Sequence, residues 1–574
     1  MGSRFFVSAV IVLSALFAHA EGRRVLVVMK SGRAYQTAQQ VMNSRESGGV
    51  LDTQASLVAR HWFAVNAELQ DSLKHVKSLV VKVGDKADIE RLRRMPEVAF
   101  VEEEVFHPAP QPVGAVGPLK INLPRAVAAR PAQSVPMGDF HPGEKTPWGI
   151  GAVKAMDGWF KAAGGEGVRV LVLDTGIDKN HPSIAENFEA GEDFVGDEAE
   201  PYPYFDRHSH GTHVAGTIAG VMDNAGFTGV APKARLLAGR VCSASGCSNI
   251  AIAQGVNWGV EQKVDIISMS LGGAWATPAE RDAIRAAEAA GVTIIAASGN
   301  DGTSRVSYPA ALPEVIAVGA VNSQLERAAF SQYGPELAVV APGVNISSCV
   351  PLGSGRVADV RMTMNGEEGA SLNSNTFKGA ADVPVPVENV LVYAGLGRAE
   401  DYAGLDVRGK FVLAARGEIK FVEKAQFAVD AGAAGLIIFN NAPGLVQGTL
   451  VENGSPSLPI PVFGIEQAAG EAVRDALLRN QVVSARLAVL ATDYSALDGT
   501  SMATPHVSGV AALIKAVRRD LTPAQVKDIL QRTATPLAPN AGNEFGAGLV
   551  NAGAAVDAAL EMRSAPLKMA VGSR

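Results

Sequence analysis

Short apolar segments that alternate with helical stretches are the feature that most limits the fold of this chain. From Pro147 on, the apolar segments have strand length, and Asn249–Glu261 and Pro278–Ala290 have helical periodicity. Strands without a polar face are typical of a parallel sheet covered on both sides by helices, and such α/β sheets bind ligands beyond the carboxyl ends of their strands. The segments are Val168–Asp174, Ala234–Val241, Val264–Gly273, Val292–Asn300 and Val315–Val321.

Two further units accompany this predicted sheet domain. Residues 21–106 combine strand-like Val25–Lys30 and Ser78–Gly84 with a helical Asp88–Met95, which indicates a small α+β domain. Residues 352–492 have strand and helix candidates of their own and contain no His, Cys or Trp, so we interpret them as a domain inserted into a surface loop. The predicted division is 1–20, 21–106, a linker at 107–145, the sheet domain at 146–351 and 493–562, the insert at 352–492, and a tail at 563–574.

The N-terminus and the charge indicate where the protein works. Arg4, the apolar run Phe5–Phe17 and the sequence Ala18-His19-Ala20 predict a signal peptide, with a buried N-terminal helix as the alternative. This run is short for a membrane span and no other apolar stretch reaches that length, so we expect a secreted protein without a membrane span. The 574 residues carry a formal net charge of −7 and no long Lys/Arg block, which argues against nucleic acid as a partner.

The three cysteines are Cys242, Cys247 and Cys349. In an oxidising compartment Cys242 and Cys247 can form a bridge within one loop and leave Cys349 over. The odd count leaves the pairing open.

A serine stands where a helix is predicted to begin. Residues 498–506 read DGTSMATPH, and apolar residues recur at helical spacing after them. Because Pro505 lacks an N–H, it fits a helix only in the first turn or at a kink. Ser501 is then either an N-cap or a nucleophile beside free backbone N–H groups.

A serine nucleophile needs a base, and the base needs an acid that orients it. His210 stands where RHSHGTHVAG turns into a helix, whereas His213 lies within that helix and is interpreted as structural. Asp174 ends a buried strand, where a carboxylate needs hydrogen bonds or caps the next turn. Asn300 also ends a strand, and its amide is either an oxyanion donor or a turn residue.

Other classes of protein fit less well. The histidines His208, His210 and His213 are close in sequence, as in a metal hydrolase. However, Thr212 stands where that pattern needs an acid, and no second cluster completes a zinc site. A lipase-like esterase needs G-x-S-x-G, but Ala503 replaces the second glycine. A binding protein on an inactive protease scaffold is the non-enzyme alternative, and the presence of all three candidate residues argues against it.

The chain resembles the subtilisin-like serine proteases, or subtilases, for which Asp…His…Ser is the chain order. The resemblance implies a subtilisin-like three-layer α/β fold with a mainly parallel sheet, and a serine endopeptidase that acts through an acyl-enzyme. It implies Asp174 as the acid, His210 as the general base and Ser501 as the nucleophile. The motifs are Val172–Asp178, His210–Gly216, Ser268–Gly273, Ala296–Asn300 and Gly499–Gly509.

The resemblance also implies how a substrate is held. Asn300 and the backbone N–H of Ser501 would bind the oxyanion. An extended peptide would pair with the strand around Ser268–Gly272, so that protein or peptide substrates are the expected partners. The implied substrate-binding residues are Ser268, Met269, Ser270, Leu271, Gly272 and Gly299.

The flanking units resemble known accessories of the family. Residues 21–106, particularly Pro96–Val105, resemble the ferredoxin-like inhibitory propeptide, which implies a zymogen that cleaves itself between about 107 and 145. The insert, above all Gly409–Asn441, resembles a protease-associated (PA) domain with a non-catalytic role. We expect a monomer.

The chemistry implied by the resemblance needs no cofactor. Members with a calcium site beside the catalytic helix carry an acid after His-Pro, where this chain has Ser183. The loop Asp223–Gly226 offers oxygen ligands, but about six are usually needed, so no metal ligand is assigned and structural calcium stays open.

Overall fold

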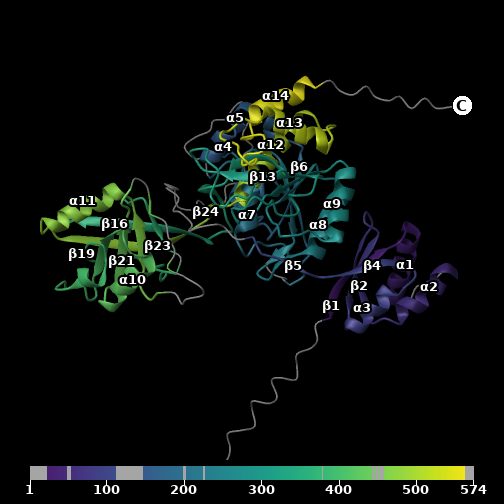
Figure 1. Ribbon diagram of the computed structural model, residues 1–574, viewed down its shortest axis with the longest axis horizontal. Coiled ribbons are helices and arrows are strands. Elements are labelled where there is room, and N and C mark those ends of the chain that lie inside the picture. Colours follow the sequence, from purple (N-terminus) through teal and green to yellow (C-terminus); the bar gives the residue numbers. More distant parts are fainter. Residues whose placement is uncertain are drawn as a thin grey trace, which may run out of the picture.

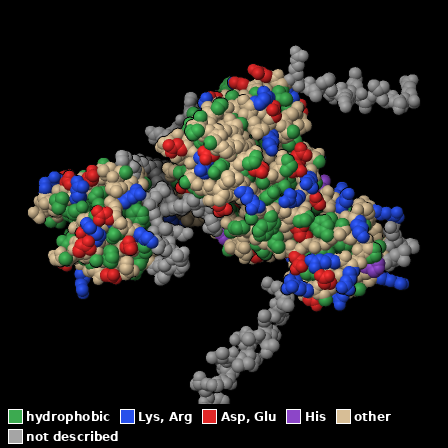
Figure 2. Space-filling view, in the orientation of Figure 1, with side chains coloured by type: hydrophobic (Ala, Val, Ile, Leu, Met, Phe, Trp, Pro, Cys, Tyr) green, Lys and Arg blue, Asp and Glu red, His purple; other side chains and the backbone are tan. Residues whose placement is uncertain are grey.

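The computed structural model describes residues 22–47, 53–110, 146–197, 202–223, 226–377, 379–442, 445–446, 450 and 458–562. The predicted signal peptide, most of the predicted linker and the predicted tail lie outside these residues. The chain forms a central body, an N-terminal unit against one side of it, and an insert that projects from it (Figure 1). Cationic and anionic side chains are interspersed on the face shown in Figure 2.

The central body is built on a parallel sheet, and the predicted α/β class is confirmed. Strand β6 pairs with β8 on one side and with β11 on the other, so the order of the strands reverses beside β6. Such reversals open a crevice beyond the carboxyl ends of the strands. From edge to edge the strands are β14 (Leu337–Pro342), β13 (Val315–Val321), β12 (Thr293–Ala297), β11 (Ile266–Met269), β6 (Arg169–Asp174), β8 (Arg235–Arg240) and β7 (Phe188–Asp193).

Helices cover both faces of this sheet. In β6, Val170 and Val172 belong to one apolar cluster, and Leu171 and Leu173 belong to the other, which is why the strand reads as a continuous apolar run. The first face packs against α5 (Ala155–Trp159), α7 (His210–Ala219), α12 (Thr500–Val517), α13 (Pro523–Thr533) and α14 (Ala552–Glu561), and the second against α8 (Asn249–Glu261) and α9 (Pro278–Ala289).

The N-terminal unit has an antiparallel sheet with the order β2-β3-β1-β4, which is the ferredoxin-like arrangement. Asp85 caps helix α3 by accepting the N–H of Asp88, so this helix begins two residues before the predicted Asp88–Met95. The elements are β1 (Arg23–Met29), α1 (Gly32–Ser47), α2 (Thr53–Phe63), β2 (Ala67–Leu73), β3 (Ser78–Val83), α3 (Lys86–Arg93) and β4 (Val98–Glu103).

The insert has its own eight-stranded sheet. The chain enters it after β15 (Ile346–Cys349) and leaves it before β24 (Tyr494–Leu497), and these two strands pair with Cys349 opposite Tyr494. The insert therefore begins and ends at neighbouring points on the central body. Its elements are β16 (Gly355–Met364), β17 (Glu367–Glu368), β18 (Ser374–Thr376), β19 (Val387–Tyr393), β20 (Phe411–Ala415), α10 (Phe421–Asp430), β21 (Gly435–Phe439), β22 (Val462–Ile465), α11 (Gln467–Leu478) and β23 (Val483–Thr492).

Helix α12 crosses the centre of the body and packs closely at Gly509. A Cβ atom at Gly509 would lie 2.4 Å from Cβ of Val230, a buried residue whose carbonyl accepts a hydrogen bond from Trp159 Nε1. The contact leaves no room for a larger residue.

We therefore expect Gly509→Ala to lower the free energy of unfolding by about 1–3 kcal/mol, because the extra methyl group overpacks the core. The measurement is the midpoint of chemical denaturation. The control is Gly151→Ala in α4 (Trp148–Ala152), where a Cβ meets no atom within 4 Å. Equal midpoints for the two variants would contradict the packing argument.

Candidate active site

An aspartate and a histidine meet in the interior where β6 ends and α7 begins. Asp174 Oδ1 lies 2.8 Å from Nδ1 of His210, and the two side chains are 0% and 1% exposed. Oδ1 also accepts the N–H of Thr175 at 2.7 Å. With Nδ1 donating to the carboxylate, Nε2 of the neutral ring is an acceptor, and it is buried without a hydrogen-bond partner among the described residues. His210 is thus oriented as a base.

A second buried carboxylate joins the end of β6 to α7. Asp206 accepts hydrogen bonds from Thr175 Oγ1 at 2.8 Å and from the N–H of Thr212 at 2.8 Å. Thr175 Oγ1 in turn accepts the N–H of Gly211 at 3.0 Å. A Cβ at Gly211 would lie 2.1 Å from the carbonyl oxygen of Gly176, so only glycine allows this approach. Asp206 was missed in the sequence, although it stands four residues before His210.

Electrostatics distinguish His210 from the other buried histidines of α7 and α12. Burial lowers the pKa of His210, but the adjacent Asp174 carboxylate outweighs it and raises the pKa above the ordinary value. Burial lowers the pKa of His213 to about 3 and that of His506 to about 4. His213 Nε2 and His506 Nδ1 bond to backbone carbonyls, at 2.8 Å in each case. Of these three, only His210 faces an acid that stabilises its protonated form.

Ser501 lies in the first turn of α12, and its neighbour Pro505 lies inside that helix rather than in its first turn. Pro505 has no N–H to bond to the carbonyl of Ser501 four residues earlier. The hydroxyl of Ser270, just beyond β11, donates to that carbonyl at 2.8 Å instead. The hydroxyl of Ser501 donates to the carbonyl of Ser270 at 3.0 Å. The structure thus holds Ser501 against Ser270, and among the described residues no hydrogen bond joins it to His210.

Asn300 follows β12 and faces the start of α12. Its Oδ1 accepts both the N–H of Thr500 at 2.9 Å and the hydroxyl of Thr500 at 2.8 Å. Because a backbone N–H can only donate, this contact fixes the orientation of the amide. The amide Nδ2 is then the group of Asn300 that remains to donate to a ligand.

A cavity of about 730 Å³ lies beside Ser501 and Asn300. Four of the six predicted substrate-binding residues line it, whereas Ser268 and Met269 are buried in β11. The hydroxyl of Ser268 accepts a hydrogen bond from Ser508 of α12 at 2.9 Å. The four predicted substrate-binding residues that do line it are Ser270, Leu271, Gly272 and Gly299.

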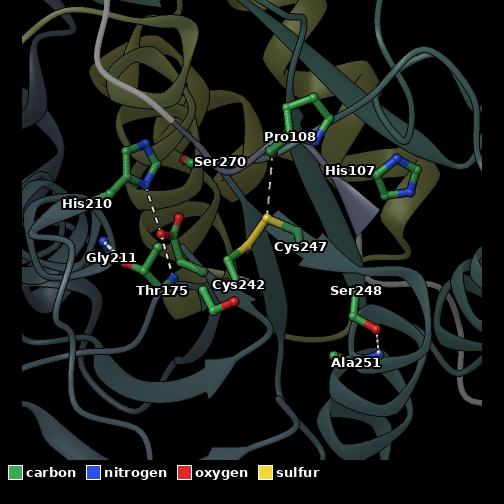
Figure 3. Close-up of a disulfide and its surroundings, with 12 residues drawn as sticks. His107, Pro108, Thr175, His210, Gly211, Cys242, Cys247, Ser248, Ala251 and Ser270 are labelled. Atoms are coloured by element: carbon green, nitrogen blue, oxygen red, sulfur yellow. Dashed lines mark hydrogen bonds and ion pairs between the residues drawn. A yellow bond between two sulfur atoms is a disulfide. The ribbon is translucent and has the colours of Figure 1, made fainter. Parts of the chain in front are cut away.

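The end of the N-terminal unit extends into this cavity. Strand β5 (Phe106–His107) pairs antiparallel with β10 (Gly246–Ser248), and Pro108–Pro110 then line the cavity together with Ser501. Pro108 lies beside the disulfide, as Figure 3 shows. An extended segment of the same chain therefore occupies the groove next to Ser501.

Acidic residues of β4 and the segment after it contact the starts of two helices. Glu102 accepts the N–H of Ala279 in the first turn of α9 at 3.0 Å and the side chain of Asn249 at 2.7 Å. Glu104 accepts from the hydroxyl of Ser248, which caps α8. Carboxylates at helix N-termini are stabilised by the helix dipole, so these contacts hold the N-terminal unit on α8 and α9.

The three clustered histidines do not form a metal site. Within the described part of the chain, no group of three or more His, Cys, Asp or Glu side chains is placed to hold a metal ion. Ser183, at the position considered for calcium, has its hydroxyl 3.0 Å from that of Tyr494, so this position offers no carboxylate ligand. Asn224 and Ala225 of the loop considered with it lie outside the described residues.

The cysteines form one disulfide, between Cys242 and Cys247, which joins β9 (Cys242–Ser243) to β10. Cys349 is free and buried, and burial raises the pKa of its thiol to about 12. The bridge braces the strand on which the N-terminal segment lies.

Comparisons with known proteins agree with this geometry. A family model described as "Subtilase family" matches residues 165–377 and 468–548, and one described as "PA domain" matches residues 385–473. The chain is 38% identical over 292 residues to subtilisin NAT of Bacillus subtilis subsp. natto, which spans 50% of this chain and 67% of that protein. It is 43% identical over 216 residues to subtilisin of Bacillus pumilus, and this match covers 37% of this chain and 77% of that protein.

Among solved structures, the crystal structure of the psychrophilic subtilisin-like protease Apa1 from the Antarctic psychrotroph Pseudoalteromonas sp. AS-11 is similar. The sequence identity is 31% and the TM-score is 0.56. The match covers 72% of this chain and 99% of that one.

We expect Asp174→Asn to lower the pKa of His210. In the native protein the Asp174 carboxylate stabilises the imidazolium form, and without it only the charge of Asp206 opposes burial, which favours the neutral ring. The measurement is the NMR titration of the His210 ring. The control is Asp557→Asn, which removes a half-exposed carboxylate paired with Lys161. An unchanged His210 pKa in Asp174→Asn would exclude the carboxylate as the cause of the shift.

Proposed function

We propose that this chain, which belongs to the subtilase family of serine endopeptidases, hydrolyses peptide bonds in proteins through Asp174, His210 and Ser501. The observation that carries the proposal is the buried Asp174–His210 pair, whose Nε2 has no partner among the described residues. Ser501 and Asn300 line the cavity on the same edge of the sheet. We also propose that the chain is made as a zymogen and is secreted.

The first step is proton transfer from Ser501 to His210. The hydroxyl of Ser501 leaves the carbonyl of Ser270, turns toward Nε2 and gives up its proton as its oxygen attacks the substrate carbonyl. His210 becomes an imidazolium, which the Asp174 carboxylate stabilises, in keeping with the raised pKa of His210. Since the unprotonated ring is the base, activity should increase as the pH rises through this pKa.

The charge that develops on the substrate oxygen lies near the start of α12. The amide Nδ2 of Asn300 and the backbone N–H of Ser501 donate to this oxygen, and the N-terminal end of the helix dipole adds a favourable field. His210 then returns its proton to the leaving amine. Water hydrolyses the acyl-enzyme by the same route in reverse.

Substrates bind as an added strand. Strand β5 already pairs with β10 in this way, and the chain that follows it lies in the cavity beside Ser501. We propose that the predicted propeptide, residues 21–106, acts as an inhibitor through the segment Pro108–Pro110 that follows it in the cavity, until a cut within 107–145 frees it. The scissile bond lies at or beyond the last described residue of the segment, Pro110.

The proposal of secretion rests mainly on residues outside the described part of the chain. The predicted signal peptide is residues 1–20, and the disulfide between Cys242 and Cys247 suits an oxidising compartment. In the part of the chain that the structure describes, no helix is long and apolar enough to cross a membrane.

We expect Ser501→Ala to fold but to keep its N-terminal unit, because the nucleophile of self-cleavage is gone. Intact mass spectrometry of protein from a protease-deficient host gives the chain length. The control, Ser484→Ala on β23 of the insert, should mature as the native chain does. Labelling of the mature protein by a serine-directed phosphonate should map to Ser501. Normal maturation of Ser501→Ala would falsify its proposed role.

We expect removal of Leu352–Thr492 to preserve hydrolysis of small chromogenic peptides and to alter hydrolysis of large proteins. A short turn can replace the insert because Cys349 and Tyr494 are opposed across the β15–β24 pair. Ser354 Oγ in the insert lies 3.1 Å from Ser209 Oγ, next to His210. The single variant Ser354→Ala therefore separates this contact from the loss of the whole insert. Complete loss of peptide hydrolysis by a folded deletion protein would argue against an accessory role.

A further inference from the structure

The side chain of His107 lies in a buried pocket that ends in a carboxylate. Its Nε2 lies 2.8 Å from Oε1 of Glu280, in the first turn of α9, and both side chains are 4% exposed. Glu280 is not among the residues predicted to act in catalysis or in substrate binding. The partner of this carboxylate comes from the segment that we propose to be cut off during maturation.

The walls of the pocket belong to the central body. A Cβ at Gly273 would lie 2.4 Å from Nδ1 of His107, so the pocket needs glycine at this position to admit a ring. The Trp275 ring lies 6.0 Å from the imidazole, centroid to centroid, and closes another side. His107 itself is held by its pairing with Cys247 in β10. The pocket therefore remains as a binding site once the N-terminal unit leaves.

The position of this pocket along a bound peptide follows from the chain that occupies it. Pro108–Pro110 follow His107 and line the cavity beside Ser501. Three extended residues span about 10 Å, which is the reach from a side-chain pocket to a cleavage site further along the same strand. Pro110 is the last described residue of this segment, and we take the bond after it as the one presented to Ser501. A peptide bound in this register places the fourth residue before the cleaved bond next to Glu280.

Glu280 presents one oxygen to the pocket and uses the other for the helix. Its Oε2 accepts the N–H of Thr277 at 2.6 Å, which completes the capping box of α9. Its Oε1 faces His107. A glutamate can cap a helix without being buried, so capping alone does not explain why Glu280 lies in a pocket. A buried carboxylate oxygen needs a hydrogen-bond donor, and a cationic donor compensates best for the lost hydration.

The cationic side chains near Glu280, Arg281 and Arg305, interact with other groups. The guanidinium of Arg281 lies over the ring of Tyr308 at 5.0 Å and donates to a backbone carbonyl. Arg305 donates to the carbonyl of Ala274 at 3.4 Å. Glu102, the carboxylate of the N-terminal unit next to α9, departs with that unit. The free pocket therefore presents a negative charge.

We propose that Glu280 is a specificity-determining residue, which selects histidine, lysine or arginine as the fourth residue before the cleaved bond. This inference rests on the proposed function, since it concerns the peptides that Ser501 cleaves. Acidic residues at that position are disfavoured by repulsion from the same carboxylate.

The test compares internally quenched peptides in which one position is fixed and the others are randomised. The mature enzyme is counted by titration with a serine-directed phosphonate, and mass spectrometry locates each cleaved bond. We expect kcat/KM for His, Lys or Arg at the fourth position to exceed that for Leu by about tenfold or more, with Glu lowest. The same residues at the third or fifth position should show no such preference.

Glu280→Gln is the decisive variant, because glutamine keeps the capping acceptor for Thr277 and removes the charge. It should bring the ratio of kcat/KM for basic peptides to kcat/KM for the leucine peptide to about one. The melting temperature should fall only slightly, because a negative charge near the N-terminus of α9 is lost. Asp282→Asn, an exposed change of equal charge on the same helix, is the matched control and should keep the native ratio. A native ratio in Glu280→Gln, or a basic preference at another position, would overturn the inference.

The experiment distinguishes failure of the Glu280 proposal from failure of the proposed function. If the titrated enzyme cleaves peptides without regard to the fourth residue, the role of Glu280 is wrong and the proposed function stands. If the protein neither reacts with the phosphonate nor cleaves any peptide, the proposed function itself is wrong.

Discussion

Asp174 and His210 are almost fully buried and meet where β6 ends and α7 begins. Burying a carboxylate and an imidazole costs free energy unless each finds a partner. The sheet brings Asp174 to its carboxyl edge, and the hydrogen bonds of Asp206 hold the start of α7 against that edge. The absence of a side chain at Gly211 lets the start of α7 approach the backbone of Gly176, just beyond the end of β6. The geometry of the proposed base thus depends on the register of the whole sheet rather than on a local turn.

Helix α12 shows how the same edge positions the proposed nucleophile. Pro505 removes a hydrogen bond from the first turns of the helix, and Ser270 donates to the carbonyl of Ser501 that is left free. The hydroxyl of Ser501 bonds back to the carbonyl of Ser270. Two strand-to-helix hydrogen bonds therefore fix the start of α12 relative to β11. The start of this helix, where the proposed oxyanion donors stand, is held by Ser270, which follows β11 and also lines the cavity.

The parts that follow from local pattern could be predicted, and those set by distant contacts could not. The continuous apolar runs correctly predicted the parallel sheet, and α8 has the predicted bounds Asn249–Glu261. The position of Pro505 inside α12 depends on Ser270, which lies 231 residues before Ser501. The capping box at Glu280 is visible in sequence, but the partner of its other carboxylate oxygen is His107, which is 173 residues away. No local pattern reports such a partner.

The N-terminal unit holds the body through two kinds of contact that act differently. Glu102 and Glu104 bind the starts of α8 and α9 outside the cavity, where no substrate residue is needed. His107 occupies a pocket that a substrate would share. On the proposed function, a change at Glu280 would alter both the fit of the N-terminal unit and the choice of substrate, whereas a change at Glu102 would alter only the binding of the N-terminal unit. Because the helix contacts lie outside the groove, the affinity of the proposed inhibitor could vary while the proposed specificity of the groove stays the same.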